Sequence, residues 1–282
     1  MDAYVHGYQQ NENERLQNQA RTLTDLLHFD TVYPAGHTVL EAGCGVGAQT
    51  VTLAARSPSA CFTSIDINSQ SIDAAQQKTL AAGLTNVTFQ QADIFSLPFE
   101  PESFDHVFVC FVLEHLAQPM EALTRLKRLL KPGGTVTVIE GDHGSTYFHP
   151  DSLAARAAIQ CQITLQQQAG GNALIGRQLY PLMSAAGFDQ ISVSPRMVYA
   201  DASRPDLVDG FTRKTFTAMI EGVRASAILE GLITAEDFDR GIKDLHRTTQ
   251  DDGVFCYTFF KGIGGRESSA CVTRDGDRSL PI

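Results

Sequence analysis

The chain has 282 residues, of which 43% are hydrophobic, so it can bury a sizeable core as one large α/β domain, with or without an elaboration. Its formal net charge of -10 opposes binding to polyanions and argues against nucleic acid as a partner. No apolar run approaches the roughly 20 residues that cross a bilayer, and the polar N-terminus lacks a signal-peptide core. We therefore expect a cytoplasmic protein without a membrane partner, whose six cysteines show no CxxC or secreted spacing and stay reduced.

The first half of the chain alternates short apolar runs with amphipathic segments, which is typical of a doubly wound, mostly parallel sheet. The pattern predicts strands at residues 38–42, 61–66, 87–90, 104–110 and 135–140. It predicts helices at residues 12–28, 47–56, 69–82 and 119–130. Further along the chain we expect helices at 152–169 and 176–186 and strands at 191–199 and 254–260.

Residues 200–253 separate the last two predicted strands, where a short connection would suffice. Their apolar side chains recur with helical spacing, which predicts an inserted helical layer. This layer is either a lid over a substrate or a surface for dimerisation or packing. Residues 264–282 are rich in Gly, Ser, Arg and Asp and lack periodicity, so we expect a disordered tail.

Three glycines alternate in the segment from Glu41 to Gly47, directly after the first predicted strand. Glycine relieves the Cβ clash where a strand turns sharply into a helix, and it lets a ligand approach the backbone. A nicotinamide-binding loop reads G-x-G-x-x-G, whereas this loop reads G-x-G-x-G with an acid two residues before the first glycine. The spacing therefore favours a cofactor other than a nicotinamide dinucleotide.

Four further signals follow in the order of the strands. Asp66 ends the second strand, where its carboxylate can accept hydrogen bonds from both hydroxyls of a ribose. Asp93 and Ile94 form a pair that can bond an adenine amino group and cover its ring. Asp105 lies at the start of the fourth strand, and residues 130–134 form a Pro-Gly-Gly turn before the fifth.

Taken in this order, the signals resemble the class I S-adenosylmethionine-dependent methyltransferases over roughly residues 36–142. The resemblance implies a doubly wound, mostly parallel seven-stranded sheet with a C-terminal antiparallel hairpin and, here, a helical insertion or lid before the last strand. It implies S-adenosylmethionine as cofactor and S-adenosylhomocysteine as product. The domain organisation expected is an N-terminal cap segment and helix (1–35), a cofactor-binding α/β core (36–199), the insertion (200–253), the last strand (254–263) and the tail (264–282).

The resemblance also assigns residues to the cofactor. The loop beside the methionine part corresponds to Glu41, Gly43, Gly45 and Gly47. The ribose and adenine contacts correspond to Asp66, Ile67, Asp93 and Ile94, and the end of the fourth strand, facing the sulfonium, to Cys110 and Phe111. In related enzymes an N-terminal segment folds over the cofactor, and Tyr8 matches that place, where its ring suits a cation.

Polar residues cluster after the fourth and fifth predicted strands. Because active sites of open α/β sheets form outside the carboxyl ends of strands, both clusters should face the crevice of the glycine loop. We predict catalytic roles as base, hydroxyl or aromatic wall for His143, Tyr147 and His149. We predict substrate contacts for Glu114, His115, Glu140, Asp142 and Arg177, with carboxylates for a cationic amine and the arginine for a carboxylate.

Alternatives to these roles stay open. The acids and histidines at 140–149 are oxygen and nitrogen ligand types, but the spread of metal carboxylates over several loops is not evident, so we predict no metal. Glu114 and His115 also suit a structural or cofactor-side pair, and an arginine on an amphipathic helix such as Arg177 is often solvated.

The function expected is methyl transfer to a small molecule, with N- or O-methylation favoured and a specialised metabolite as one candidate acceptor. The alternatives are a protein that binds S-adenosylmethionine without transferring the methyl group and a nicotinamide-dependent oxidoreductase, which the glycine spacing opposes. The expected partner is the small-molecule substrate, and the chain is expected to be a monomer or a homodimer.

Overall fold

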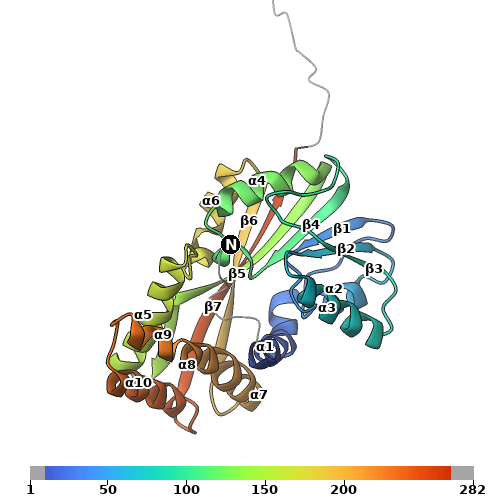
Figure 1. Cartoon of the computed structure of the whole chain (residues 1–282). Coiled ribbons are helices and arrows are strands. Elements are labelled where there is room, and N and C mark those ends of the chain that lie inside the picture. Colours follow the sequence, from blue (N-terminus) through green and yellow to red (C-terminus); the bar gives the residue numbers. More distant parts are fainter. Residues whose placement is uncertain (1–9, 268–282) are drawn as a thin grey trace, which may run out of the picture.

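The computed structural model describes residues 10–267, so Tyr8, the predicted cap segment before it, and most of the predicted tail lie outside the described residues. A seven-stranded sheet with the order β3-β2-β1-β4-β5-β7-β6 forms the centre (Figure 1). The strands β1 to β5 pair in parallel, and β7 runs antiparallel between β5 and β6. The strands are β1 (Thr38–Ala42), β2 (Cys61–Asp66), β3 (Val87–Gln91), β4 (Phe104–Cys110), β5 (Leu130–His149), β6 (Asp189–Ala200) and β7 (Val254–Gly265). The predicted fold class is confirmed.

Helices precede, connect and extend the strands. Those before β6 are α1 (Gln10–His28), α2 (Thr50–Arg56), α3 (Ser69–Ala81), η1 (Leu113–His115), α4 (Pro119–Leu129), α5 (Leu153–Gln168), η2 (Ile175–Gln178) and α6 (Leu179–Ala185). Those between β6 and β7 are α7 (Pro205–Leu207), the π-helix η3 (Val208–Thr217), α8 (Ala218–Gly222), α9 (Arg224–Leu229) and α10 (Ala235–Arg247). In Figure 1 the helices α8, α9 and α10 gather beside α5.

Two large apolar cores hold these helices to the sheet. One core contains side chains of α1, α2, α5 and the insertion, and the other contains side chains of α4 and α6. In α4 the buried residues recur every three or four positions, which is one helical face; they are Ala122, Leu123, Leu126 and Leu129. Helix starts are capped by side chains where the chain enters α3, α5 and α10, at Asn68, Ser152 and Thr234.

The fifth strand is longer than the sequence predicts. We expected a strand at 135–140 followed by a loop, whereas β5 continues to His149 and pairs with β7 as far as Val254. The register shifts between Asp142 and Tyr147, because five steps along β5 span only two along β7. Residues 143–146 therefore form a bulge inside the strand. The sequence pattern of β5 alone does not show that pairing with β7 lengthens the strand.

The last strand also exceeds its predicted end. β7 reaches Gly265, so residues 264 and 265 of the predicted tail pair with β5. The guanidinium of Arg266 then donates to the carbonyl oxygen of Leu130 at 2.6 Å. Glycine at 264 also lets α6 lie close to β7, since a Cβ there would lie 2.9 Å from the Met183 methyl group.

The predicted helical insertion is present, and it packs into the main core instead of resting on the surface. Phe211, Phe216 and Phe238 are at most 2% exposed and belong to the core shared with α1 and α5. Gly241 lets α10 approach α5 closely, since a Cβ there would lie 2.5 Å from the carbonyl oxygen of Ala154. The insertion is therefore an integral part of the fold.

An ion cluster with two buried cations and a partly exposed acid ties the segment after α1 to the antiparallel strands. The ammonium of Lys261, whose side chain is 1% exposed, donates to Asp30 Oδ1 and to Thr31 Oγ1, each at 2.6 Å. Arg196 Nη2 donates to the other carboxylate oxygen of Asp30 at 2.5 Å. Two cations that have lost much of their hydration thus share one acid.

We predict that Asp30→Ala destabilises the protein by about 3 kcal/mol, because it leaves the buried Lys261 without its charge partner. The matched control is Asp209→Ala, which removes an exposed acid paired with Lys214 and should cost less than about 1 kcal/mol. Urea denaturation of both variants measures the difference. Equal losses would show that the buried cluster stabilises the fold no more than a surface pair.

Candidate active site

The turn from β1 into α2 holds its glycines at positive φ, with 79° at Gly43, 50° at Gly45 and 73° at Gly47. Residues with a Cβ rarely adopt this region of backbone space. The N–H groups of Gly43 and Cys44 donate to the carbonyl oxygen of Ile65 at 2.8 and 2.9 Å. These bonds hold the turn against β2.

The three glycines are required for different reasons. A Cβ on Gly43 would lie 2.4 Å from Cγ2 of Val112, and one on Gly47 would lie 2.9 Å from Cα of Ala75. A Cβ on Gly45 would meet no other atom within 4 Å. Gly43 and Gly47 therefore permit close packing, whereas Gly45 borders open space in which a ligand can reach the backbone.

Asp66 ends β2 beside this open space. Its Oδ2 accepts a hydrogen bond from the N–H of Gly45 at 2.8 Å, and its Oδ1 accepts one from Asn68 at 2.9 Å. Burial raises the pKa of this carboxyl group, and the two bonds oppose the rise. The adjacent Ile67 is 61% exposed. An acid with remaining lone pairs beside an uncovered apolar side chain suits the ribose and the ring of a nucleoside.

Glu41 lies beneath the glycine loop and is 2% exposed. Its Oε2 accepts hydrogen bonds from the hydroxyls of Thr50 at 2.7 Å and Ser64 at 2.6 Å. Burial raises the pKa of Glu41 to about 7. The carboxyl group links β1, α2 and β2, so its observed bonds support the loop from below.

Asp93 and Ile94 follow β3. The carboxylate of Asp93 accepts a hydrogen bond from the N–H of Phe95 at 2.8 Å, and Asp93 also forms an isolated bridge with Ser96. Ile94 is 9% exposed and packs in the core on the α4 side of the sheet. The pair thus lies in a tight turn at the carboxyl end of the strand, and its predicted adenine contact stays a prediction.

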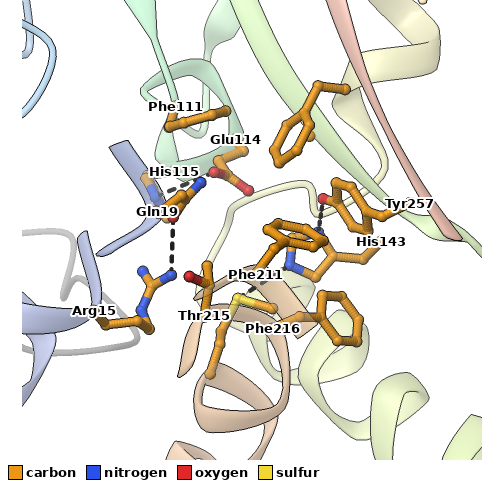
Figure 2. A pocket seen from close by; sticks show the side chains of 13 residues that line it. Arg15, Gln19, Phe111, Glu114, His115, His143, Phe211, Thr215, Phe216 and Tyr257 are labelled. Atoms are coloured by element: carbon orange, nitrogen blue, oxygen red, sulfur yellow. Dashed lines mark hydrogen bonds and ion pairs between the residues drawn. The ribbon is translucent and has the colours of Figure 1, made fainter. Parts of the chain in front are cut away.

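A cavity lies between the end of β4 and the insertion, and we call it the aromatic cavity because five of its residues carry Phe or Tyr rings (Figure 2). Its walls come from α1, the turn after β4, β5, the insertion and β7. The lining residues are Arg15, Gln19, Phe111, Glu114, His115, Gly141, His143, Phe211, Thr215, Phe216, Met219, Tyr257 and Phe259. Phe111 adjoins Val112, the residue that packs against Gly43, so the cavity and the glycine loop are neighbours.

His143 belongs to the bulge of β5 and lines the aromatic cavity. Its Nδ1 lies 3.1 Å from the hydroxyl of Tyr257, and its Nε2 lies 3.4 Å from the sulfur of Met219 (Figure 2). The side chain is buried, and this burial lowers the pKa of the imidazole. When Nδ1–H donates to the Tyr257 hydroxyl, the neutral ring keeps a lone pair on Nε2, beside Met219, that can accept a proton.

Glu114 and His115 line the same cavity from η1. The carboxylate of Glu114 accepts a hydrogen bond from Nε2 of Gln166 at 3.3 Å, and its other oxygen lies 3.7 Å from Nε2 of His115. Glu114 is 8% exposed, so its charge acts in a largely buried setting. Both residues therefore border the cavity, and their predicted contacts with a substrate stay a prediction.

Glu140 is fully buried and lies outside the cavity lining. Its Oε1 accepts hydrogen bonds from the N–H groups of Val112 at 3.0 Å and Leu113 at 2.8 Å. Burial first, and the Glu114 carboxylate second, raise its pKa well above the usual range. Glu140 thus shapes the turn that carries Phe111 and Glu114.

Asp142 and Arg177 bind each other. The guanidinium donates to both carboxylate oxygens, from Nε at 2.7 Å and from Nη2 at 2.8 Å. Neither residue is among those that line the aromatic cavity. The structure therefore does not bring them together with the other predicted substrate residues, because each already has an ionic partner.

The predicted catalytic residues separate into two groups. Only His143 lines the cavity, whereas Tyr147 is 51% exposed and His149 is also exposed on the far part of β5. The hydroxyl of Tyr147 donates to the sulfur of Met197 on the sheet surface. The bulge explains the separation, because the chain resumes its pairing with β7 at Tyr147.

Cys110 ends β4, and Phe111 follows it directly. Burial raises the pKa of the Cys110 thiol well above its usual value, which favours an unreactive thiol. Phe111 has a positive φ of 58°, and its ring lines the aromatic cavity. Between residues 10 and 267, no three His, Cys, Asp or Glu side chains gather in a way that would hold a metal ion.

Sequence reasoning missed several cavity residues. α1 contributes Arg15 and Gln19, β7 contributes Tyr257 and Phe259, and the insertion contributes side chains at Phe211, Thr215, Phe216 and Met219. The apolar periodicity of the insertion contains three of these last four, but periodicity alone does not show which members face a site. The alternation of side chains along β7 likewise does not show which of them face a site.

Comparisons with known proteins agree with this geometry. Residues 40–138 match the model of a methyltransferase domain family. An uncharacterised transposon-borne protein of Streptomyces fradiae is 36% identical over 190 residues, which cover 66% of this chain and 54% of that protein. Demethylmenaquinone methyltransferase of Staphylococcus aureus is 36% identical over 106 residues, 37% of this chain and 43% of that enzyme. The chain thus spans about half the length of the curated relatives it matches.

A solved structure shows the same fold. Phosphoethanolamine N-methyltransferase 2 of Haemonchus contortus, in complex with phosphomonomethylethanolamine and S-adenosylhomocysteine, is 18% identical with a TM-score of 0.55. The superposition covers 89% of this chain and 53% of that one. Residues 40–138 therefore match a methyltransferase domain, and the chain shares the fold of this S-adenosylhomocysteine-bound methyltransferase structure.

The open space at Gly45 yields a prediction with a matched control. Gly45→Ala should weaken S-adenosylhomocysteine binding at least about tenfold, because the new methyl group occupies space beside the loop backbone. Gly36→Ala introduces the same strain, since Gly36 has a φ of 76° and open surroundings, but it lies before β1 and should leave binding unchanged. Calorimetry measures both affinities. Equal affinities in the two variants would mean that the cofactor does not reach Gly45.

Proposed function

We propose that this chain transfers a methyl group from S-adenosylmethionine to a nitrogen or oxygen atom of a small organic molecule. The observation that carries the proposal is the packing of Val112 against Gly43, which makes the glycine loop and the aromatic cavity neighbours. A donor bound at the loop and an acceptor bound in the cavity would meet beside the turn after β4. Such juxtaposition supplies the alignment that an in-line displacement needs.

The residues around the loop fit S-adenosylmethionine. Gly45 borders open space, Asp66 has lone pairs for ribose hydroxyls, and Ile67 exposes an apolar side chain for adenine. When bound, this cofactor supplies an electrophilic methyl group on a sulfonium. The protein's own residues would orient the acceptor, exclude water and remove a proton where the acceptor carries one.

His143 is our candidate for the proton acceptor. Burial lowers its pKa, so the ring is neutral near neutral pH, and Tyr257 orients it through Nδ1. We do not extend this role to Tyr147 or His149, because both side chains are exposed outside the cavity.

A small acceptor is supported by the character of the aromatic cavity. Its rings are mostly buried, and the acidic chain opposes polyanions. The insertion supplies Phe211, Phe216 and Met219, so it would select the acceptor as part of the cavity wall instead of closing over it as a separate lid. One curated relative is named for demethylmenaquinone, a small-molecule acceptor.

Two predictions concern the whole protein, namely its cellular location and its oligomeric state. In the described part of the chain no helix has both the length and the apolarity that crossing a membrane requires. The cytoplasmic location and the monomeric or homodimeric state stay predictions.

The proposed function is tested by incubating the protein with methyl-labelled S-adenosylmethionine and a metabolite extract, and identifying the labelled product. Calorimetry should detect S-adenosylmethionine and S-adenosylhomocysteine, but not NAD, and Asp66→Ala should weaken binding by about 2 kcal/mol. If the protein binds the cofactor but no extract yields a labelled product, the alternative is favoured: a protein that binds S-adenosylmethionine without transferring its methyl group. NAD binding that depends on Asp66 would favour the oxidoreductase.

We predict that His143→Ala lowers kcat by about 10² to 10⁴ while S-adenosylhomocysteine affinity stays unchanged, the usual scale for a lost general base. His149→Ala is the control on the same strand and should keep the original rate, because its side chain is exposed. Initial rates with the identified acceptor measure both. Unchanged kcat in His143→Ala would assign proton removal to water or to another group.

The pH profile gives an independent check on His143. A base acts in its unprotonated form, so the rate should rise with pH through the pKa of the imidazole and then stay level. Because burial lowers that pKa, the rise should lie below the ordinary histidine value of about 6.5. The rising limb should be absent from the residual activity of His143→Gln. A rise centred above the ordinary value would contradict a buried neutral base.

A further inference from the structure

The rings of the aromatic cavity form one connected wall. Phe111 lies 5.4 Å from Phe259, Phe259 lies 4.7 Å from Tyr257, and Tyr257 lies 5.5 Å from Phe216, all between ring centroids. Phe211 lies 5.5 Å from the Tyr257 ring on the same wall. Such a wall offers several ring faces to one bound group, and the face of an aromatic ring attracts a cation.

Among the described residues that line this cavity, Glu114 is the only acid. Its negative charge acts on the cavity wall, since the carboxylate, after burial as the larger cause, raises the pKa of Tyr257. It also acts to raise the pKa of His143, although burial lowers that pKa overall. Gln166 and His115 approach the two carboxylate oxygens, which leaves further lone pairs for a ligand.

Arg15 brings the other formal charge to the lining, from the α1 side. Its Nη1 donates to Oε1 of Gln19 at 3.1 Å (Figure 2). It also contributes to lowering the pKa of His143. The cavity therefore has an acidic side at η1, next to Phe111, and a basic side at α1.

The chemistry of methyl transfer decides what kind of acceptor suits a buried acid at this position. A hydroxyl acceptor loses its proton and ends as a neutral ether, while the sulfonium becomes a neutral thioether. Once the proton has left, neither donor nor product carries a positive charge to pair with Glu114, which keeps only the contact with His115 at 3.7 Å, an ion pair when that ring is protonated. An amine acceptor instead takes up the positive charge as the sulfonium loses it.

We propose, building on the proposed methyltransferase function, that the acceptor is a substituted amine held between Glu114 and the aromatic wall. The nitrogen lone pair forms the new N–C bond, and the electron pair of the broken C–S bond goes to sulfur. The product is an ammonium, and where the nitrogen still carries hydrogen, His143 can take one proton from it. The cation thus stays beside the rings throughout transfer.

The test compares choline with 3,3-dimethylbutan-1-ol, which has the same shape but a carbon in place of the charged nitrogen. Binding of each is measured by calorimetry on the full chain saturated with S-adenosylhomocysteine, so that no sulfonium is present. We expect choline to bind about tenfold more tightly than the alcohol, within the range of a cation on desolvated rings.

Two variants assign the preference to its parts. Glu114→Gln should reduce the preference for choline severalfold and leave the affinity for the alcohol unchanged, because only the charge is removed. Phe216→Leu should reduce the preference while keeping an apolar side chain, which covers the case in which Glu114→Gln fails to fold. Glu121→Gln on the exposed face of α4 is the control and should behave as the original protein.

The outcomes separate this inference from the function on which it rests. Equal or tighter binding of the alcohol, or no binding of either compound while S-adenosylhomocysteine binds, overturns the amine acceptor and leaves methyl transfer standing. A preference for choline that persists in both variants overturns the role of Glu114 and the rings. Failure of S-adenosylhomocysteine itself to bind would instead contradict the proposed function.

Discussion

The antiparallel pairing of β5 with β7 is the constraint on which the site depends. β7 supplies Tyr257 and Phe259 to the aromatic cavity, and its pairing extends β5 to His149. The register shift within that pairing forms the bulge at residues 143–146, and His143 lines the cavity from this bulge. Bulges re-aim side chains beside active sites, and here the bulge separates one histidine from its neighbours on the same strand.

Acids beneath and beside the glycine loop have distinct surroundings, which give them distinct roles. Glu41 and Glu140 are buried and hydrogen-bonded by protein groups, so they support the two turns that adjoin the cofactor space. Asp66 has one bond from the glycine loop, and Glu114 lines the aromatic cavity, so both keep acceptor capacity beside space that we propose for ligands. The same residue type therefore supports the scaffold in one case and borders the proposed ligand space in the other.

The signals for the cofactor site are local in the sequence, whereas those for the acceptor cavity are not. A strand followed by glycines and an acid at the next strand end are local signals, and in the structure Gly45 and Asp66 meet at one turn, while their contacts with the cofactor stay a prediction. The acceptor cavity instead collects residues from α1, the insertion and β7, which are far apart in the chain. Periodicity marked Phe211 and Phe216 as apolar, but their direction depends on packing.

Polar residues in the second half of β5 show why proximity in sequence is a weak guide. His143, Tyr147 and His149 were expected to act together, whereas only His143 lines the cavity. Likewise, Asp142 and Arg177 were expected at the substrate, and each is engaged by the other. Ion pairs and strand register depend on how the whole chain folds, so the local spacing of residues does not predict them.

The sequence alone determined the order of strands and helices, the glycine turn and the acid that faces it, because hydrophobic periodicity and backbone freedom are local physical properties. Only the tertiary structure decided the length of β5, the place of its bulge and the composition of the aromatic cavity. These features follow from long-range pairing with β7 and from the packing of the insertion against α1 and α5. Contacts of this kind join residues that are far apart in the sequence. His143 and Tyr257, for example, are 114 positions apart, and no local pattern predicts their contact.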